Sequence, residues 1–433
     1  MSKLLSCKIY CALFMLIITS VFPLYSSIVL IDHDYGIPKM QKTALKNLDV
    51  NVLTFPNSDE SSEKFRKDNS KYLRERMMLT YTPNGVEYAT NPELRRINEI
   101  CKNKLVFRNH LKHLYPDFFY RSLKYSELET VDYKAFPYPV VVKPTRGYCS
   151  MGVYRIEDEG QWLATCKKLE RDNQIGKNIA SDFVFNPTFY IVEEALEGDE
   201  FAVDGYYDAT GKPVILNIMK RKFLGPMDTS DRIYYTSVSV VKNTFGEVTE
   251  LAKTLGNGLD IKLFPVHFEA RRNNDGKLIP IEINPMRFAS CGLSDLSFYA
   301  YGINSFEYYF TQKEPDWNEI FKKNDGYIYG SFDGNFSKNI NYDDIAYIKE
   351  DELKSKFSDV LDYQNTLTSK SGTFFALIFY KTPDIKENSE LLHLLHLNLD
   401  DFIVLKSENK YDWLTSFKEF FQGLNPWNTA SAN

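Results

Sequence analysis

The chain has 433 residues, which is enough for about three domains of ordinary size. Hydrophobic residues make up 43% of it and charged residues 25%, as expected for a globular protein that can bury sizeable cores. The formal net charge of −6, without a long basic run, argues against nucleic acid or an anionic membrane as the main partner, because both require a concentrated basic surface. The six cysteines show no spacing typical of zinc sites or disulfide frameworks, so we expect free thiols in a reducing compartment.

The N-terminus has an unusual composition. Lys3 and Lys8 precede an almost uncharged apolar stretch over residues 9–25. This pattern is typical of a signal peptide or a short membrane anchor, oriented with this end in the cytoplasm and the rest exported. A non-native leader that begins at an upstream start codon is the alternative. We therefore treat residues 1–27 as an apolar leader or anchor and leave its origin open.

Residues 28–112 alternate between short apolar runs and helix-like segments, which predicts a small α/β layer. Residues 27–32 and 51–55 have the composition of buried parallel strands. Residues 58–76 are compatible with a helix, and the stretch after Pro92 repeats apolar side chains at helical spacing.

The middle of the chain alternates further strands with helices, and from about residue 314 the pattern changes. We expect strands over residues 138–143, 153–156, 189–194, 201–207, 212–219, 264–271 and 277–283, and helices over residues 157–171 and 244–255, the latter ending at Gly256. We expect a separate α+β domain over residues 313–433, with a strand at residues 373–380 and an apolar helix near residues 391–399.

Residues 142–153 give the first chemical pattern. A strand ends in Lys143, and a loop that contains Gly147, Ser150 and Gly152 returns into another strand. Glycine lets the backbone approach a ligand closely, so that loop N–H groups can point at phosphate oxygens while the lysine adds a fixed positive charge. An ordinary hairpin loop with a solvated lysine is the alternative.

This Lys-Pro-x-x-Gly-x-x-Ser-x-Gly pattern resembles the glycine-rich loop of the ATP-grasp superfamily, especially of carboxylate–amine ligases such as D-alanine–D-alanine ligase, and of biotin carboxylase-like members. No Gly-Lys-Ser/Thr follows, so it is not a Walker loop. Residues 101–111 resemble the helix that supplies the first ATP lysine of the family. Lys104 matches better than Lys102, and an ordinary surface lysine is the alternative.

Residues 191–201 resemble the strand that joins the two ATP-binding lobes in this family. Carboxylates suit such a position because each can accept hydrogen bonds from two ribose hydroxyls. The alternative is a solvated acidic turn at a strand end. The resemblance assigns Glu193 to the adenine side, Glu194, Ala195 and Leu196 to the hinge, and Glu200 to the ribose.

Residues 264–287 predict a hairpin, because Asp-Gly at 275–276 is a preferred two-residue turn. With that turn, Glu269 lies across from Glu282, and His267 lies across from Asn284. Two carboxylates, an amide and an imidazole then share one face. Three apolar side chains take the other face: Phe268, Ile281 and Ile283.

Directly opposed carboxylates destabilise a sheet unless a cation lies between them. Mg²⁺ is usually held by one or two carboxylates together with substrate phosphates. The pattern resembles the ATP-grasp metal site, which the resemblance places at Glu269, Glu282 and Asn284. A solvent-facing polar strand is the alternative.

Two positions depart from the pattern of the family. Several relatives have Arg two residues after the metal-site Asn, where this chain has Met286, with Arg287 one place later. His267 stands where D-alanine–D-alanine ligase has an Arg that acts on the acyl transition state. A basic run could substitute, with Lys220 or Lys222 at the γ-phosphate, and a solvated loop is the alternative. The catalytic candidates are therefore Lys220, His267 and Arg287.

The resemblance covers about residues 28–312 and implies an α+β, ATP-grasp fold in which two α+β lobes clasp ATP. We expect a pre-ATP-grasp α/β domain over residues 28–112, a small lobe over 113–194, a large lobe with the metal site over 195–312, and a C-terminal α+β domain of unknown role over 313–433. The implied enzyme uses ATP with Mg²⁺ or Mn²⁺, activates a carboxylate as an acyl phosphate, joins it to an amine and releases ADP and phosphate.

Two other classes remain open: an ATP-grasp kinase, carboxylating enzyme or nucleotide-binding regulatory module, and a tethered structural protein that binds no ATP. The expected partners are a small-molecule carboxylate and amine, such as an amino acid or short peptide, with no nucleic acid. We expect a cytoplasmic protein whose membrane contact is limited to residues 9–25. The substrates cannot be identified from sequence, because loops and the N-terminal domain contact them in this family.

Overall fold

The computed structural model describes residues 26–32, 38–56, 59–147, 150–176, 185–228, 230–323, 326–337, 339–367, 373–385 and 389–406. Most of the apolar leader predicted over residues 1–27 lies outside the described residues. Among the helices that are described, none is long and apolar enough to cross a membrane.

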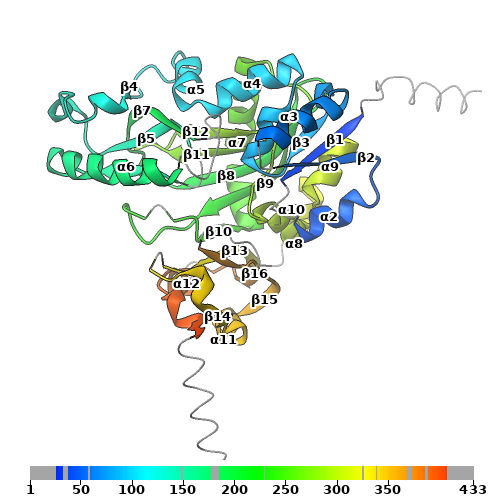
Figure 1. Cartoon of the computed structure of the whole chain (residues 1–433). Coiled ribbons are helices and arrows are strands. Elements are labelled where there is room, and N and C mark those ends of the chain that lie inside the picture. Colours follow the sequence, from blue (N-terminus) through cyan, green and yellow to red (C-terminus); the bar gives the residue numbers. More distant parts are fainter. Residues whose placement is uncertain are drawn as a thin grey trace, which may run out of the picture.

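A three-stranded parallel sheet forms the N-terminal layer. Its order is β2–β1–β3, and the central strand is buried over Ile28 to Leu30, as an apolar run without alternation predicts. The layer contains β1 (Ser27–Asp32), β2 (Val50–Phe55), β3 (Met78–Thr80), α2 (Lys39–Leu45), α3 (Asp59–Asp68), α4 (Pro92–Lys102) and α5 (Lys104–Leu111). Figure 1 shows its strands, with α2 and α3, to the right of the large sheet, and α4 and α5 above that sheet.

The small lobe is a four-stranded antiparallel sheet covered by one helix, at the left of Figure 1. Trp162, Cys166 and Leu169 of that helix pack against Val140 and Val142 of the sheet. The sheet order is β4 (Tyr120–Lys124), β7 (Asn186–Glu194), β5 (Val140–Arg146) and β6 (Tyr154–Ile156), and the helix is α6 (Trp162–Gly176).

An eight-stranded sheet forms the centre of the molecule. Its order is β12 (Leu278–Pro285), β11 (Phe264–Arg272), β8 (Glu200–Tyr207), β9 (Pro213–Arg221), β10 (Ile233–Thr236), β13 (Tyr327–Asn335), β16 (Phe374–Pro383) and β15 (Asp359–Asn365). The connections include α7 (Val238–Leu259), α8 (Leu296–Tyr301), α9 (Ser305–Thr311) and α10 (Trp317–Lys322).

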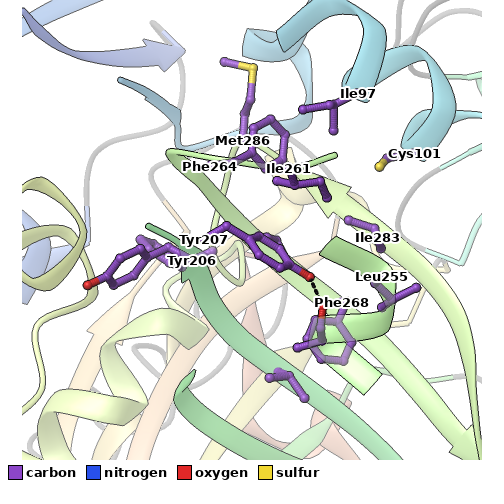
Figure 2. Packing of buried hydrophobic residues seen from close by; sticks show 14 of the residues in the cluster. Ile97, Cys101, Tyr206, Tyr207, Leu255, Ile261, Phe264, Phe268, Ile283 and Met286 are labelled. Carbon is purple, nitrogen blue, oxygen red and sulfur yellow. Dashed lines mark hydrogen bonds between the residues drawn. The ribbon is translucent and has the colours of Figure 1, made fainter. Parts of the chain in front are cut away.

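α7 is longer than the helix predicted over residues 244–255. Ser237 caps its start, and it continues past Gly256, which the sequence analysis wrongly took as its end. Gly256 is a packing position, because a Cβ there would lie 2.3 Å from the ring of Tyr207. Tyr207 in turn donates from its hydroxyl to the Ala252 carbonyl at 2.7 Å, and its ring lies near Leu255 (Figure 2).

The C-terminal segment is continuous with the large sheet, although we expected a separate domain. β13 pairs with β10 on one side and with β16 on the other, and Phe332 lies opposite Ile233. Beyond these strands, a second apolar cluster packs under a small two-stranded sheet and two helices, at the bottom of Figure 1. These elements are β14 (Ile345–Ile348), β17 (Ile403–Leu405), α11 (Glu350–Lys354) and α12 (Ser389–Leu395).

Candidate active site

A cavity of about 270 Å³ lies where α5, the small lobe and the large sheet meet. Most of the predicted site residues line it. These are Lys104, Lys143, Gly147, Ser150, Glu193, Glu194, Leu196, Glu200, His267, Glu269, Glu282, Asn284 and Arg287. Gly152, Ala195 and Lys220 do not line it.

Lys104 reaches the cavity because one helix ends and another begins beside it. α4 ends at Lys102, and the Asn103 side chain accepts hydrogen bonds from two N–H groups of the next turn, so that α5 begins at Lys104. Lys104 Nζ lies 2.8 Å from Glu282 Oε2. Lys102, the alternative candidate, does not line the cavity.

The negative charge of Glu282 is compensated by Lys104. Burial alone would raise the pKa of the Glu282 carboxyl, but Lys104, Lys143 and the Asn284 amide outweigh that effect and hold the pKa well below its ordinary value. From the sequence we expected Glu269 and Glu282 to repel each other in the absence of a cation. Lys104 instead supplies a compensating charge to Glu282 from a different element.

Glu193 binds two cations. β5 and β7 pair with Val141 opposite Glu193, so that Lys143, two residues on, shares the same face. Glu193 lies 2.6 Å from Lys143 Nζ and 2.8 Å from Arg108 Nε. Burial opposes ionisation, yet Arg108 and Lys143 lower the pKa of Glu193 to about 2. The carboxylate therefore fixes Lys143 in the cavity and ties α5 to the small lobe.

The phosphate-loop prediction is only partly described. Gly147 and Ser150 line the cavity, whereas residues 148–149 fall outside the described part of the chain. Gly152 has a φ of 70°, and a Cβ there would lie 3.3 Å from Pro144 Cδ. Gly152 therefore allows the loop backbone to turn and to pack closely against Pro144.

The predicted hinge is held to the segments before β5. The Ala195 N–H donates to the Pro139 carbonyl at 2.9 Å, and the Glu194 N–H donates to the Phe119 carbonyl at 3.1 Å. These two donors are therefore occupied within the protein. Glu194 and Leu196 line the cavity, and their contact with adenine stays a prediction.

The register predicted for the β11–β12 hairpin is confirmed. Glu269 pairs with Glu282 and His267 pairs with Asn284. The predicted two-residue turn is wrong, because the Asn273 N–H donates to the Lys277 carbonyl and closes a longer loop. The longer loop shifts the pairing by one residue.

A β-bulge beside Glu269 reverses this shift. The extra residue is Ile281, which lines the cavity and is only partly buried. We had predicted it on the core face. Phe268 and Ile283 do point into the core, as predicted, and Figure 2 shows both among the packed side chains.

His267 is fixed from behind by Asp204. Its Nδ1 lies 2.8 Å from Asp204 Oδ1, which also accepts a hydrogen bond from the Ala289 N–H at 2.8 Å. Its Nε2 lies 3.6 Å from Glu269 Oε1. Burial lowers the basicity of the ring, but the hydrogen bonds to Asp204 and Glu269 outweigh it and raise the pKa of His267 to about 9. His267 therefore presents a basic ring at the position where D-alanine–D-alanine ligase, which the sequence resembles, has an arginine.

Arg221, and not Lys220, belongs to the cavity. The two residues are neighbours on β9, so their side chains point to opposite faces of the sheet. Lys220 forms an ion pair with Asp199 at 2.6 Å and does not line the cavity. Arg221 lies 2.9 Å from Glu200 Oε1. The prediction that Lys220 meets the γ-phosphate is therefore not supported by its placement.

Glu200 faces two guanidinium groups. Besides Arg221, the NH1 atom of Arg271 lies 3.7 Å from its second oxygen. Burial raises the pKa of Glu200, and the charge of Glu269 adds to this, although Arg221 and Arg271 act in the opposite direction. Its contact with a ribose stays a prediction.

Arg287 lines the cavity because Met286 takes a left-handed conformation. Met286 has a φ of 58° and is fully buried near Ile97 (Figure 2). This turn points the next side chain, Arg287, at the cavity. Its NH1 donates to the neighbouring Phe288 carbonyl at 3.0 Å.

Several charged residues that line or support the cavity were not predicted from the sequence. Asp204 lies in a strand in which every residue is buried, so a charged residue in that apolar run was a usable signal. Arg108 lies on the same helix as Lys104 but was not singled out. Asp231 and Asp333 also line the cavity, from segments to which we assigned no chemistry.

The metal candidates fit Mg²⁺ by their chemistry. Glu269, Glu282 and Asn284 offer oxygen ligands on one wall, and Asn284 Nδ2 donates to Glu282 Oε1 at 3.0 Å. Within the described ranges, no group of three or more His, Cys, Asp or Glu side chains is placed to hold a metal ion. A set of two carboxylates and an amide matches an ion that also takes oxygens from substrate phosphates.

Two lobes that enclose a cavity lined by lysines and by oxygen ligands are the arrangement of the ATP-grasp fold. Residues 136–295 match the family model for the ATP-grasp domain. The chain therefore contains an ATP-grasp domain and has the ATP-grasp fold. No curated protein matches it in sequence.

Solved structures with the same fold cover most of the chain. An L-amino acid ligase from Bacillus licheniformis matches with a TM-score of 0.63 and 18% identity, over 88% of this chain and 99% of that one. An N5-carboxyaminoimidazole synthase from Aspergillus clavatus, in complex with ADP and its ribonucleotide, matches with a TM-score of 0.59 and 13% identity, over 87% and 99%. A biotin carboxylase from Campylobacter jejuni matches with a TM-score of 0.53 and 12% identity, over 88% and 92%.

Proposed function

We propose that this protein is an ATP-dependent ligase that activates a carboxylate as an acyl phosphate, joins it to an amine, and releases ADP and phosphate. One observation carries the proposal. Lys104 and Lys143 lie in the same cavity as the metal candidates Glu269, Glu282 and Asn284. Phosphoryl transfer requires positioning of the phosphates and neutralisation of their charge. Fixed cations beside hard oxygen ligands for a metal ion can supply both.

Glu269, Glu282 and Asn284 would hold Mg²⁺, which neutralises charge on the phosphates of ATP. Lys143 is fixed by Glu193 and would place a pre-positioned charge against the phosphate oxygens. Lys104 is paired with Glu282 and supplies a second cation on the same wall. No enzyme nucleophile is needed, because the substrate carboxylate attacks the γ-phosphorus directly.

The reaction has two steps. In the first step, a carboxylate oxygen forms a bond to the γ-phosphorus, the bond from that phosphorus to the β–γ bridging oxygen breaks, and ADP leaves. In the second step, the amine nitrogen bonds to the carbonyl carbon, the carbon–oxygen bond to phosphate breaks, and the amine proton passes to solvent. His267 and Arg287 both line the cavity and could donate hydrogen bonds to the oxygen on which negative charge develops.

The solved structures support this reaction class as an analogy. One is named an L-amino acid ligase, and others are named a carboxyaminoimidazole synthase and a biotin carboxylase. At these low identities the likeness establishes fold alone, so the site residues carry the functional argument.

The test is ADP release in the presence of Mg-ATP, single carboxylates and hydroxylamine as a small acceptor. We expect ADP and a hydroxamate in equal amounts, because hydroxylamine captures the acyl phosphate. ADP without hydroxamate would favour the kinase reading. ADP that requires bicarbonate would favour a carboxylating enzyme. If the protein neither binds nor consumes Mg-ATP under any of these conditions, the proposal is overturned.

A further inference from the structure

The C-terminal segment contributes a charged side chain to the cavity. Asp333 of β13 lines it together with Asp231, which precedes β10. Phe332 is fully buried in the C-terminal apolar cluster, so the alternation of a strand turns Asp333 to the opposite face, toward the cavity. The Asp333 N–H donates to the Arg232 carbonyl at 2.9 Å, so Asp333 lies beside Arg232, the residue that follows Asp231 in the chain.

The two carboxylates differ in how they are compensated. Asp231 lies 3.1 Å from Arg221 NH2 and accepts a hydrogen bond from the Tyr234 hydroxyl at 2.9 Å. Asp333 has no such cation among the described residues. Burial raises the pKa of Asp333 well above its ordinary value, and the charge of Asp231 adds to this. Burial and the charge of Asp231 both disfavour the ionised form of Asp333. A ligand ammonium group would counteract both, since it compensates the carboxylate charge directly.

Arg287 gives an independent indication of a ligand. Its side chain is only 7% exposed, yet it lines the cavity. Its one described hydrogen bond is to the carbonyl of the next residue, and it forms no ion pair with any described carboxylate. A buried guanidinium whose remaining N–H groups face a cavity suits a carboxylate ligand, because its planar donors match both oxygens.

Arg287 and Asp333 face the same part of the cavity. The Cys291 thiol is within electrostatic reach of both, and they shift its pKa in opposite directions. The adjacent Gly292 lies against the strand that pairs with β13, because a Cβ there would lie 2.4 Å from Leu377, the residue opposite Asp333. Arg287 and Asp333 both line the cavity and form no ion pair with each other in the described part of the chain. Each can therefore meet one charge of a ligand that carries both.

We infer that the carboxylate substrate is an amino acid whose carboxylate is bound by Arg287 and whose ammonium group is bound by Asp333. The inference rests on the proposed function, because it names the molecule that is activated at the same site. It gives the C-terminal segment a role in specificity. Asp231, already paired with Arg221, contributes longer-range attraction to the ammonium group.

The test compares amino acids with isosteres that carry a hydroxyl in place of the ammonium group. The full-length protein is assayed with Mg-ATP and hydroxylamine, an acceptor that is mostly uncharged at neutral pH, so that only the activated substrate varies. The probe pairs are L-alanine and L-lactate, L-phenylalanine and L-phenyllactate, and L-methionine and its 2-hydroxy analogue. We expect kcat/KM for hydroxamate formation to favour the amino acid of the best pair by roughly 10- to 100-fold, the range for a charged hydrogen bond.

Asp333→Asn should remove most of this preference by raising KM for the amino acid, with KM for ATP unchanged. Asp333→Glu should retain much of it, because the charge is kept. Asp359→Asn is the matched control, since it removes a carboxylate from β15 of the same sheet, where Asp359 pairs with Lys381 outside the cavity. Melting temperatures establish that each variant is folded.

The outcomes separate this inference from the proposed function. Hydroxy acids that react as well as amino acids, or an unchanged preference in Asp333→Asn, would overturn the inference and leave the ligase assignment standing. An effect of Asp333→Asn that appears only when an amine replaces hydroxylamine would place the ammonium group on the acceptor and would also overturn it. If no carboxylate of any kind gives ADP and hydroxamate, both the inference and the proposed function fail.

Discussion

At the scale of single residues, ion pairs position the charged side chains of the cavity. Each pair joins residues from different elements, so its geometry depends on the whole fold. Desolvation of the charges is costly, and close partners offset it. The pairs are Lys104 with Glu282, Lys143 with Glu193, and Arg221 with Glu200.

Glu282→Gln tests the metal site. Without ligands we expect the variant to be less stable than the wild type by about 1–3 kcal/mol, because Lys104 loses a charged partner. It should also lose most of the stabilisation that Mg-ATP gives the wild type. Melting curves with and without Mg-ATP measure both effects. Glu247→Gln, which removes an exposed partner of Arg272, is the control and should keep the Mg-ATP effect. An undiminished effect in Glu282→Gln would exclude this residue as a metal ligand.

Lys143→Ala and Lys220→Ala form a second pair at this scale. The structure places Lys143 in the cavity and Lys220 outside it. We expect Lys143→Ala to lower ATP turnover by roughly 100-fold or more, as loss of one pre-positioned charge does. It should also cost about 2 kcal/mol of stability, because Glu193 keeps only Arg108 as a cation. Lys220→Ala should stay within a few-fold of wild type in an ADP assay. The reverse order would show that the face of β9 is wrongly assigned.

At the scale of elements, α7 shows how a glycine can be misinterpreted from sequence. A glycine inside a helical pattern suggests an end, but helix ends are set by capping and packing as well as by propensity. Gly256 lies inside α7 because the Tyr207 ring occupies the space of its Cβ. Gly246, on the same helix, has no atom within 4 Å of that position.

These two glycines give a matched prediction. Gly256→Ala should destabilise the protein by about 1–3 kcal/mol, because the ring of Tyr207 must move within a packed core. Gly246→Ala should stabilise it by up to about 1 kcal/mol, because alanine favours the helix and meets nothing. Denaturant unfolding of both variants measures the difference. Equal effects of the two substitutions would contradict the packing explanation.

At the scale of the whole molecule, the long sheet joins the ATP-grasp lobe to the C-terminal segment. β10 and β13 are hydrogen-bonded neighbours although about a hundred residues separate Ile233 from Phe332. The cavity wall therefore includes a residue from beyond the matched family domain. Unfolding of the C-terminal strands should consequently expose an edge of the central sheet.

Phe332→Ala tests this continuity. The side chain is fully buried, so we expect a loss of about 3–5 kcal/mol. Hydrogen exchange should show that amides of β9 and β10 lose protection together with those of β13 and β16. Tyr347→Ala, which truncates an exposed side chain in the same segment, should change stability by less than about 1 kcal/mol. Loss of protection confined to β13 and later elements would indicate a separate C-terminal domain.

The sequence by itself determined the features that depend on short-range pattern. Lys143 at a strand end before a glycine loop, and the opposition of Glu269 and Glu282, follow from alternation within neighbouring strands. The register survived a wrong turn type because a bulge compensated for it. Such features are local, since a strand of period two fixes which side chains share a face wherever the strand is placed.

Only the tertiary structure decided which faces meet. Arg108 pairs with Glu193 from 85 residues away, and Asp333 reaches the cavity from the C-terminal segment. Lys220 and Arg221 are equally basic in sequence, and the sheet alone selects Arg221. The physical reason is that alternation assigns a side chain to a face, whereas packing of distant segments determines what that face contacts.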